Sequence, residues 1–582
     1  MEQNRIYIFL ALCFVSYMMY DAWVREHAPK TPMVNTTQPS TATPGAGDST
    51  TLPGSTNDMP LLAASKPATA SLTNVTAAPG SKLAGERISV YTDVYHVEID
   101  TLGGDLRKVD LLKYPVSIVA KDQPFKLMDD SPQRFFVAQS GWHLPQNPSQ
   151  VPGTKTIYQV AKKEYRLLDG EKSVRVELQW QNADGVEFTK GYVFQRGSYE
   201  IELEHSINNT SAKELQTNLF LRLQRNAPEE SSGFMMMPVS VGPVYYSPDQ
   251  KYKKYKFADI DKTDASSGGV KDVIKREIAG GWAGMIEQFF VAAWLPAKED
   301  SYRYFTSKMD DASNHYLIGM MKAETVAAKE QQHKTSARLY VGPKIQKHLA
   351  DVAPGLELSV DYGWLTFISK PLFWVMDQIN TFVGNWGWSI ILLTIAIKLV
   401  FYKLSEASYR SMAKMKSVTP RMMALKERYG DDKQKMNQAL MDMYKKEKIN
   451  PVGGCLPILI QIPVFIALYY VLLESVELRQ TPWVLWIHDL SIMDPYFILP
   501  IIMGVTMMIQ QRLNPTPMDP MQAKIMMVLP VIFTVMFAVF PAGLVLYWVV
   551  NNTLSIAQQW YITKHVLAEE KHTAGHHSHK KE

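Results

Sequence analysis

Residues 384–402 read GNWGWSIILLTIAIKLVFY. The stretch is apolar enough to enter a bilayer, yet it carries Lys398 between Ile397 and Leu399. A charged side chain inside a membrane span is costly and usually faces a bundle interior or a water-filled cavity, so Lys398 is a candidate functional residue. The alternative is snorkelling, because a four-carbon stem lets the ammonium group reach the interface near Lys403. The stretch alone leaves both interpretations open.

Length and composition set the outer bounds. The chain has 582 residues, of which 46% are hydrophobic, and a net charge of +4. This length accommodates several domains, and so small a net charge does not favour a nucleic-acid-binding protein. Both cysteines, Cys13 and Cys455, lie in apolar segments. The sequence therefore predicts neither a disulfide framework nor a metal site.

The N-terminal region divides into an anchor and a tether. An apolar run follows Arg5, and no small-residue cleavage site comes after it, so residues 1–27 are predicted to form an uncleaved signal-anchor transmembrane helix. Residues 28–85 are rich in Pro, Thr, Ser and Ala and contain few aromatics. Such a segment cannot bury enough apolar area to offset its chain entropy, so a disordered linker is expected there.

The next region, residues 86–361, has the pattern of β-strands. Val174, Val176 and Leu178 alternate with polar residues, and dipeptides such as Asp184-Gly185 mark turns. A region of this size predicts a large antiparallel sandwich. We find no convincing catalytic constellation, which favours a binding or scaffolding domain. A sugar-processing enzyme is the alternative, although the sequence nominates no pair of acids for it.

Residues 362–383 are rich in aromatic and aliphatic side chains but are interrupted by Lys370, Pro371 and Asp377. An amphipathic segment of this kind just before a span predicts a helix lying in the membrane interface. A further span is the alternative, which the proline and the charges disfavour.

The C-terminal region alternates apolar and charged segments. Residues 403–450 read as a helical hairpin, with Asp431 as the expected N-cap of its second helix. The stretch 402–450 contains twelve Lys and Arg against six Asp and Glu, a net charge of +6. The predicted spans are 384–402, 451–473, 495–511, 525–540 and 542–562.

Charge sets the expected orientation of these spans. The basic hairpin should face the cytoplasm by the positive-inside rule. The loop 474–494, which is mainly acidic, should lie outside. By parity the sandwich is then outside as well, and both termini, including the basic, His-rich tail 563–582, are inside. The tail histidines (His572, His576, His577 and His579) are expected to be solvated or ribosome-facing, with metal binding as the alternative.

Polar side chains recur on the predicted spans. Their i, i+4 and i+7 spacings place the members of each span on one helical face. Together with a lysine they predict a hydrated groove that opens to the cytoplasm. The candidate groove residues are Thr394, Lys398, Gln461, Thr506, Gln510, Asn551, Asn552, Ser555 and Gln558. Several spans are also short, which a membrane protein can accommodate by thinning the bilayer locally.

Long runs of the chain resemble one known family. They are YGWLTFISKPLFWVMDQINTFVGNWGWSI (362–390), NPVGGCLPILIQIPVFIALYY (450–470), VELRQTPWVLWIHDLSIMDPYFILPIIMGVTM (476–507) and FPAGLVLYWVVNN (540–552). These runs closely resemble the YidC membrane protein insertase family. GGWAGMIEQFFVAAWLP (280–296) and LYVGPK (339–344) are similar to its Gram-negative branch, which carries a large periplasmic domain.

The resemblance implies a multi-domain membrane protein. Its parts would be an all-β supersandwich periplasmic domain, an N-terminal anchor helix, and an α-helical five-helix insertase core whose groove opens to cytoplasm and lipid. Lys398 stands where the family usually has Arg, and Lys403 where it has Pro. The family's apolar substrate slide matches Phe465, Met503, Phe537 and Trp548.

The implied function is insertion and folding of inner-membrane proteins, with no covalent chemistry, no catalytic residue, no cofactor and no metal. Expected partners are nascent membrane proteins, the Sec translocon, the ribosome and membrane lipids, without nucleic-acid specificity. The implied location is the inner membrane, as a multi-pass protein with cytoplasmic termini. The alternative is a polytopic transporter with an extracellular sensing sandwich, which would favour paired internal repeats that we do not find.

Overall fold

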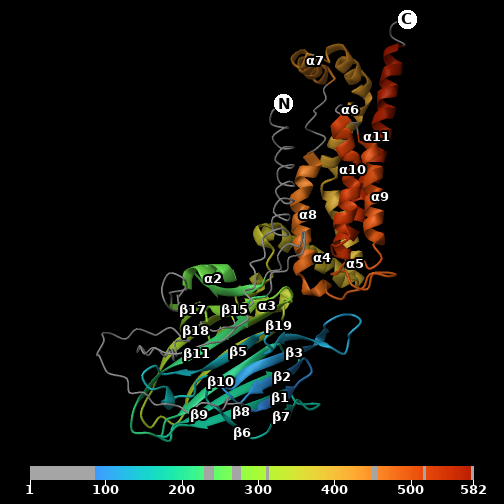
Figure 1. Cartoon of the computed structure of the whole chain (residues 1–582). Coiled ribbons are helices and arrows are strands. Elements are labelled where there is room, and N and C mark those ends of the chain that lie inside the picture. The colour runs from blue at the N-terminus through green and yellow to red at the C-terminus, as the bar shows by residue number, and fades with distance from the viewer. Residues whose placement is uncertain are drawn as a thin grey trace, which may run out of the picture.

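The computed structural model describes residues 85–228, 241–264, 277–309, 314–430, 432–447, 456–514 and 520–578. A β domain comes first along the chain, and a helical region follows it (Figure 1). The predicted anchor 1–27 and nearly all of the predicted linker lie outside the described residues, as do both cysteines. The side chains of the His-rich tail also lie outside them.

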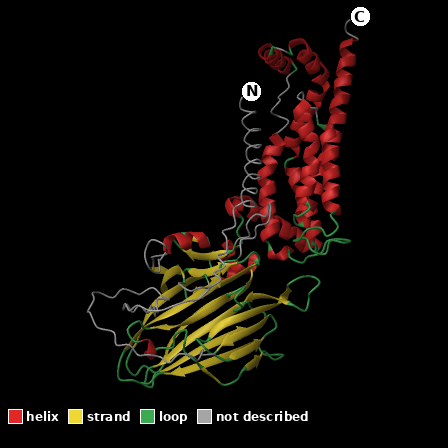
Figure 2. Cartoon of the chain, viewed as in Figure 1, coloured by secondary structure: helices red, strands yellow, loops and turns green. Residues whose placement is uncertain are grey.

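The β domain consists of two large sheets (Figure 2). One runs in the order β14 (Glu277–Ala279), β17 (Ser301–Lys308), β18 (His315–Val326), β11 (Leu215–Asn226), β5 (Phe136–His143), β3 (Asp105–Pro115), β2 (Tyr95–Asp100), β1 (Arg87–Tyr91) and β7 (Glu164–Arg166), with β4 (Pro124–Met128) paired to β3. The other runs in the order β13 (Lys251–Lys254), β12 (Gly242–Ser247), β15 (Trp282–Ile286), β16 (Phe290–Pro296), β19 (His333–Pro343), β10 (Glu200–Asn208), β9 (Glu187–Gln195), β8 (Ser173–Gln181) and β6 (Gln159–Val160). Among the described strands, only β1 and β7 pair in parallel.

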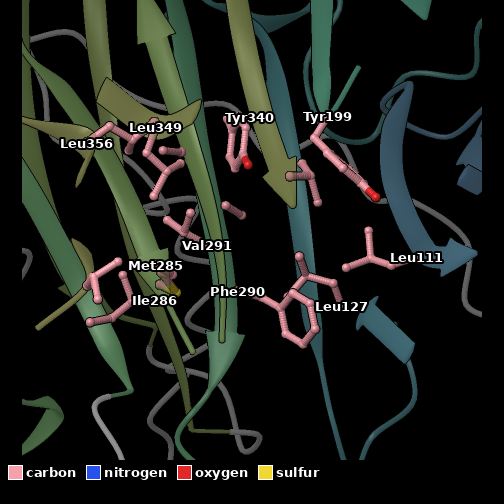
Figure 3. Close-up of a cluster of buried hydrophobic side chains, with 14 of the residues drawn as sticks. Leu111, Leu127, Tyr199, Met285, Ile286, Phe290, Val291, Tyr340, Leu349 and Leu356 are labelled. Atoms are coloured by element: carbon pink, nitrogen blue, oxygen red, sulfur yellow. The ribbon is translucent and has the colours of Figure 1, made fainter. Parts of the chain in front are cut away.

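The alternating pattern of the sequence matches the burial of the strands. In β8, Val176 and Leu178 are fully buried, whereas Arg175 and Glu177 are exposed. Successive side chains of a strand point to opposite faces, so the apolar set lines the space between the sheets. Figure 3 shows part of this core, where Leu111 and Leu127 of one sheet lie near residues of the other sheet, including Phe290. The predicted antiparallel sandwich is confirmed.

Short helical segments accompany the sandwich. They are η1 (Pro148–Gln150), α2 (Phe257–Asp264), α3 (Gln346–Val352) and η2 (Leu356–Ser359). The helical region then contains η3 (Gly363–Leu365), α4 (Thr366–Val383), α5 (Trp386–Val400), α6 (Tyr402–Tyr429), α7 (Lys433–Lys446), α8 (Leu456–Glu474), η4 (Val476–Leu478), α9 (Ile498–Leu513), α10 (Pro520–Phe537) and α11 (Ala542–Ser578). The expected bounds of the spans differ from these by a few residues, and α11 continues through most of the predicted tail.

The apolar helices are short, as the sequence indicated. Within the described residues, no single helix combines the length and the apolar character needed to cross a bilayer alone. The pair α5 and α6 meets that requirement together, with a 68° bend between the two helices.

Helix α4 has two different faces. Phe367, Trp374 and Phe382 are 71%, 62% and 89% exposed, while Phe373 and Met376 are buried. The buried face packs against α5 and α8. A helix with one packed face and one exposed apolar face is compatible with the predicted position in the membrane interface.

Helices α6 and α7 form the predicted hairpin. Val418 and Met422 of α6 pack against Leu440 of α7. The N-cap of α7 is Asp432, whose carboxylate accepts the Lys435 backbone N–H at 3.0 Å. The expected cap, Asp431, lies outside the described residues. The cap is one residue later because α7 itself begins at Lys433, and a cap directly precedes the first helical residue.

A buried joint connects the two regions. The Lys344 ammonium, just after β19, donates to the Glu474 carboxylate at the end of α8 at 3.1 Å and to Ser359 O at 3.2 Å. The side chains of this ion pair are 0% and 4% exposed. Gln288 also donates to Leu473 O at 3.1 Å. Burial lowers the pKa of Lys344, and the nearby Glu474 carboxylate opposes that shift and favours the charged lysine.

Candidate functional site

Lys398 lies in the last turn of α5 and points to α11. Its Nζ donates to Ser555 Oγ at 2.7 Å, and Ser555 Oγ donates in turn to Asn551 O at 2.7 Å. The lysine is half-buried and Ser555 is buried. Within the described residues, Lys398 forms no ion pair with a carboxylate. The site therefore holds a positive charge against one neutral hydroxyl.

Lys403, close by in α6, has a contrasting environment. Its side chain is 91% exposed and lies 3.5 Å from Glu406. A snorkelling lysine would resemble Lys403, with its ammonium group in solvent. Lys398 instead contacts a buried residue of another helix, so the contact favours the first interpretation of the sequence.

Helix α11 connects three other helices through polar contacts. In addition to the Ser555 contact with α5, Asn551 Oδ1 accepts from Gln461 Nε2 of α8. Asn552 Nδ2 donates to Thr506 Oγ1 of α9 at 3.4 Å. We call these residues (Lys398, Gln461, Thr506, Asn551, Asn552 and Ser555) the polar cluster. Six of the nine groove candidates belong to it.

The other three candidates lie outside this cluster. Thr394 is buried, but its hydroxyl donates to Ile390 O of its own helix at 2.7 Å. Gln510 is half-buried and makes no side-chain hydrogen bond to any described residue. Gln558 is half-buried and its buried Nε2 has no partner within the described part of the chain.

Sequence reasoning missed Gln559 as a site residue. It is 2% exposed, and its Nε2 donates to Asn514 Oδ1, just after α9, at 3.0 Å. Gln559 follows Asn552 by seven residues, which is two helical turns, so the two share a face. That spacing was the available signal, and it extends the polar face of α11 toward the end of α9.

The predicted slide residues form an aromatic cluster in the helical region. The Trp548 ring centroid lies 4.9 Å from that of Phe465 and 5.3 Å from that of Phe537. Met503 and Phe537 are 0% and 3% exposed, so they belong to the packed core and present no open surface in this structure. Contact between these two residues and a client would require α9 and α10 to move apart.

An exposed apolar surface also lies on α9 and α10. Ile501 and Val505 of α9 are 56% and 44% exposed, and Ile532 and Val535 of α10 are 56% and 70% exposed. Large apolar side chains gathered on helix surfaces are typical of contact with lipid. Within the described residues, no group of three or more His, Cys, Asp and Glu is placed to hold a metal ion.

Comparisons with known proteins identify the family. A model of the YidC periplasmic domain matches residues 87–375, and a model of the 60Kd inner membrane protein matches residues 378–570. The membrane protein insertase YidC of Thioalkalivibrio sulfidiphilus is 48% identical, over 97% of this chain and 99% of the relative. The chain belongs to the YidC family.

A second YidC relative and one solved YidC structure are also similar. The membrane protein insertase YidC of Pseudomonas putida strain GB-1 is 46% identical over 99% of this chain and 100% of its own length. An active YidC insertase crystal structure with its first transmembrane domain resolved covers 82% of this chain and 95% of that chain, at 17% identity and a TM-score of 0.37. At that score the structural likeness adds nothing to the assignment, which rests on the sequence matches.

Proposed function

We propose that this YidC family member inserts nascent membrane proteins into the inner membrane and receives the polar tail of a client at the polar cluster. The observation that carries the proposal is the Lys398 ammonium, which is held between helices by Ser555 without a carboxylate partner among the described residues. An anionic group of a client can supply the missing counter-charge. No covalent step is required.

The mechanism lowers the cost of moving a polar tail through an apolar layer. Buried polar groups need hydrogen-bond partners, and the amides and hydroxyls of the polar cluster offer donors and acceptors. The short helices support a thinned bilayer. Helix α5 has 15 residues, which rise about 22 Å, against about 30 Å for a typical hydrocarbon core. The tail therefore has a shorter apolar path to cross.

The apolar segment of the client leaves toward lipid. It passes along the exposed faces of α9 and α10 and, once these two helices move apart, along the slide residues, and its transfer contributes roughly 25 cal/mol per Å² of apolar surface removed from water. The basic hairpin α6–α7 faces the cytoplasm and receives clients. The Sec translocon and the ribosome are the expected protein partners, and the surrounding lipids complete the groove.

Disulfide cross-linking to a client tests where its two parts lie. Gln510→Cys leaves the polar cluster intact because Gln510 makes no hydrogen bond in it, and Ile509→Cys, on a 46% exposed neighbour, is the matched control. Both are made in a Cys13→Ser/Cys455→Ser background. A ribosome-arrested client carries a single cysteine either in its polar tail or in its apolar segment.

We expect the tail cysteine to cross-link to position 510 in preference to position 509, and the apolar segment to show the opposite preference. The reason is that Gln510 is a groove candidate, whereas Ile509 belongs to the exposed apolar face. Equal cross-linking of the tail to both positions would refute the proposed path.

The proposed orientation places the sandwich in the periplasm and both termini in the cytoplasm. In the same cysteine-free background, Ser417→Cys on the exposed surface of α6 should react with an impermeant thiol reagent only from the cytoplasmic side. Leu485→Cys, at a 77% exposed position between α8 and α9, should react only from the periplasmic side. Reaction of both cysteines from one side contradicts this orientation.

A further inference from the structure

The β3–β4 hairpin ends in an exposed apolar tip. The chain leaves β3 at Pro115 and continues VSIVA (116–120), and we call residues 116–123, which connect β3 to β4, the hairpin tip. Val116 is 52% exposed and Val119 is 97% exposed. The tip is closed by hydrogen bonds, since Val116 N donates to Gln123 O at 2.8 Å and Gln123 N donates to Ala120 O at 3.1 Å. The fold thus presents branched apolar side chains on an ordered turn.

The hairpin is fastened to the loop that follows α8. The guanidinium group of Arg479 donates to Pro115 O at 2.7 Å, and Gln480 Nε2 donates to the same oxygen at 2.8 Å. Arg479 also lies over the Phe125 ring of β4, 5.7 Å from its centroid. In Figure 1 the β3–β4 hairpin extends beyond the sheet on the side of the helices. The tip is therefore held close to the ends of the membrane helices.

The loop to which the hairpin is fastened has an apolar surface of its own. Leu485, Ile492 and Tyr496 are 77%, 53% and 65% exposed. Tyrosine side chains such as Tyr496 at the ends of membrane helices are typical of the headgroup layer. Val119 lies four residues beyond Pro115, a reach of at most about 14 Å. The headgroup layer on each side of a bilayer is about 5–8 Å thick, so this reach is long enough to enter it.

The charges near the tip fit a lipid surface. The Lys113 ammonium lies 3.9 Å from the Asp93 carboxylate and its side chain is 57% exposed, while Lys121 and Asp122 are both exposed. Lysines beside exposed aliphatic residues match the arrangement that lets a protein bury apolar side chains at a headgroup boundary while its ammonium groups meet anionic lipid. With Asp93 beside Lys113 and Asp122 beside Lys121, the lysines and aspartates balance, so the contact depends on the exposed valines and not on net charge.

We propose that the hairpin tip inserts Val116 and Val119 into the headgroup layer of the outer leaflet, so that the periplasmic domain contacts the membrane directly. This contact rests on the proposed membrane placement and is independent of the groove mechanism. It adds to the buried joint at Lys344 and limits rocking of the sandwich relative to the helices.

Spin labels test the contact in the full chain. Labels are attached in the Cys13→Ser/Cys455→Ser background at Val119→Cys, at Leu168→Cys and at Leu485→Cys. Leu168 is the matched control, since it is a 60% exposed aliphatic residue that follows β7 by two residues. Strand β7 lies at the end of the sandwich remote from the helices (Figure 1). Leu485, in the loop between the membrane helices α8 and α9, is expected to lie at the level of the headgroups. The protein is reconstituted in vesicles of phosphatidylethanolamine and phosphatidylglycerol.

The measurement is the collision rate of each label with oxygen, which concentrates in lipid, relative to a water-soluble nickel chelate. We expect the ratio at position 119 to approach that at 485 and to exceed that at 168 severalfold. An aqueous ratio at 119 with a headgroup ratio at 485 would overturn the contact while leaving the membrane placement intact. A label at 119 shielded from both reagents would also overturn it, because a protein surface would then cover the tip.

Discussion

Replacing Lys398 with Glu is expected to abolish insertion of clients whose translocated tails are acidic. A carboxylate about 8 Å from an ammonium group gains about 2 kcal/mol at an effective dielectric constant of about 20. Lys398→Met keeps the length of the side chain and removes that attraction, which should slow insertion about 30-fold. Lys398→Glu adds repulsion of similar size. Lys398→Arg keeps the charge and should be tolerated.

The measurement is protease protection of client tails of graded charge, in vesicles that contain each variant at equal level. Lys403→Glu is the matched control, because it makes the same charge change at a 91% exposed side chain in the adjacent turn. Screening by solvent should leave that variant close to wild type. Equal loss of acidic-tailed clients in the Lys398 and Lys403 variants would mean that the overall charge of this end of the helix matters, and the polar cluster does not.

The sequence nominated the residues that form the polar cluster, but it did not predict which side chains contact one another. An ionisable residue in an apolar stretch is conspicuous, and helical spacing identified Asn551 and Ser555 as members of one face. Spacing alone does not fix the rotation of a helix about its axis. Gln558 and Gln559 were therefore indistinguishable until packing placed Gln559 beside Asn514. The hydroxyl of Thr394 bonds to its own backbone, which is an option that every Ser or Thr in a helix has.

Pairings between distant segments could not be predicted. The period of two identified strands such as β8, but it carries no information on which strand lies beside which. Strand β11 pairs with β5 and β18, which precede and follow it by many residues. The ion pair between Lys344 and Glu474 could not be predicted for the same reason, since the two residues are 130 positions apart in the sequence. Such contacts depend on the whole fold, whereas strand periodicity is a local property.

The second large expected effect is a loss of stability when the buried ion pair between Lys344 and Glu474 is broken. Lys344→Met is expected to leave the Glu474 carboxylate buried without its cation, at a cost of about 3–5 kcal/mol. Lys347→Met is the matched control. Lys347 also connects the sandwich to the helices, through an ion pair with Asp377 at 2.6 Å, but its side chain is 66% exposed. Although the Asp377 side chain is only 15% exposed, the lysine of this pair lies largely in solvent, so its removal should cost less, on the order of 1 kcal/mol.

The double variant Lys344→Met/Glu474→Leu distinguishes a buried charge from a general packing defect. Replacing both partners by apolar side chains removes the stranded carboxylate, so the double variant should recover most of the stability lost in Lys344→Met. The measurements are the thermal unfolding midpoint of the purified full chain in detergent and the rate of proteolytic cleavage between the sandwich and α4. A double variant as unstable as the single one, or a loss in Lys347→Met equal to that in Lys344→Met, would show that the joint does not depend on this buried charge pair.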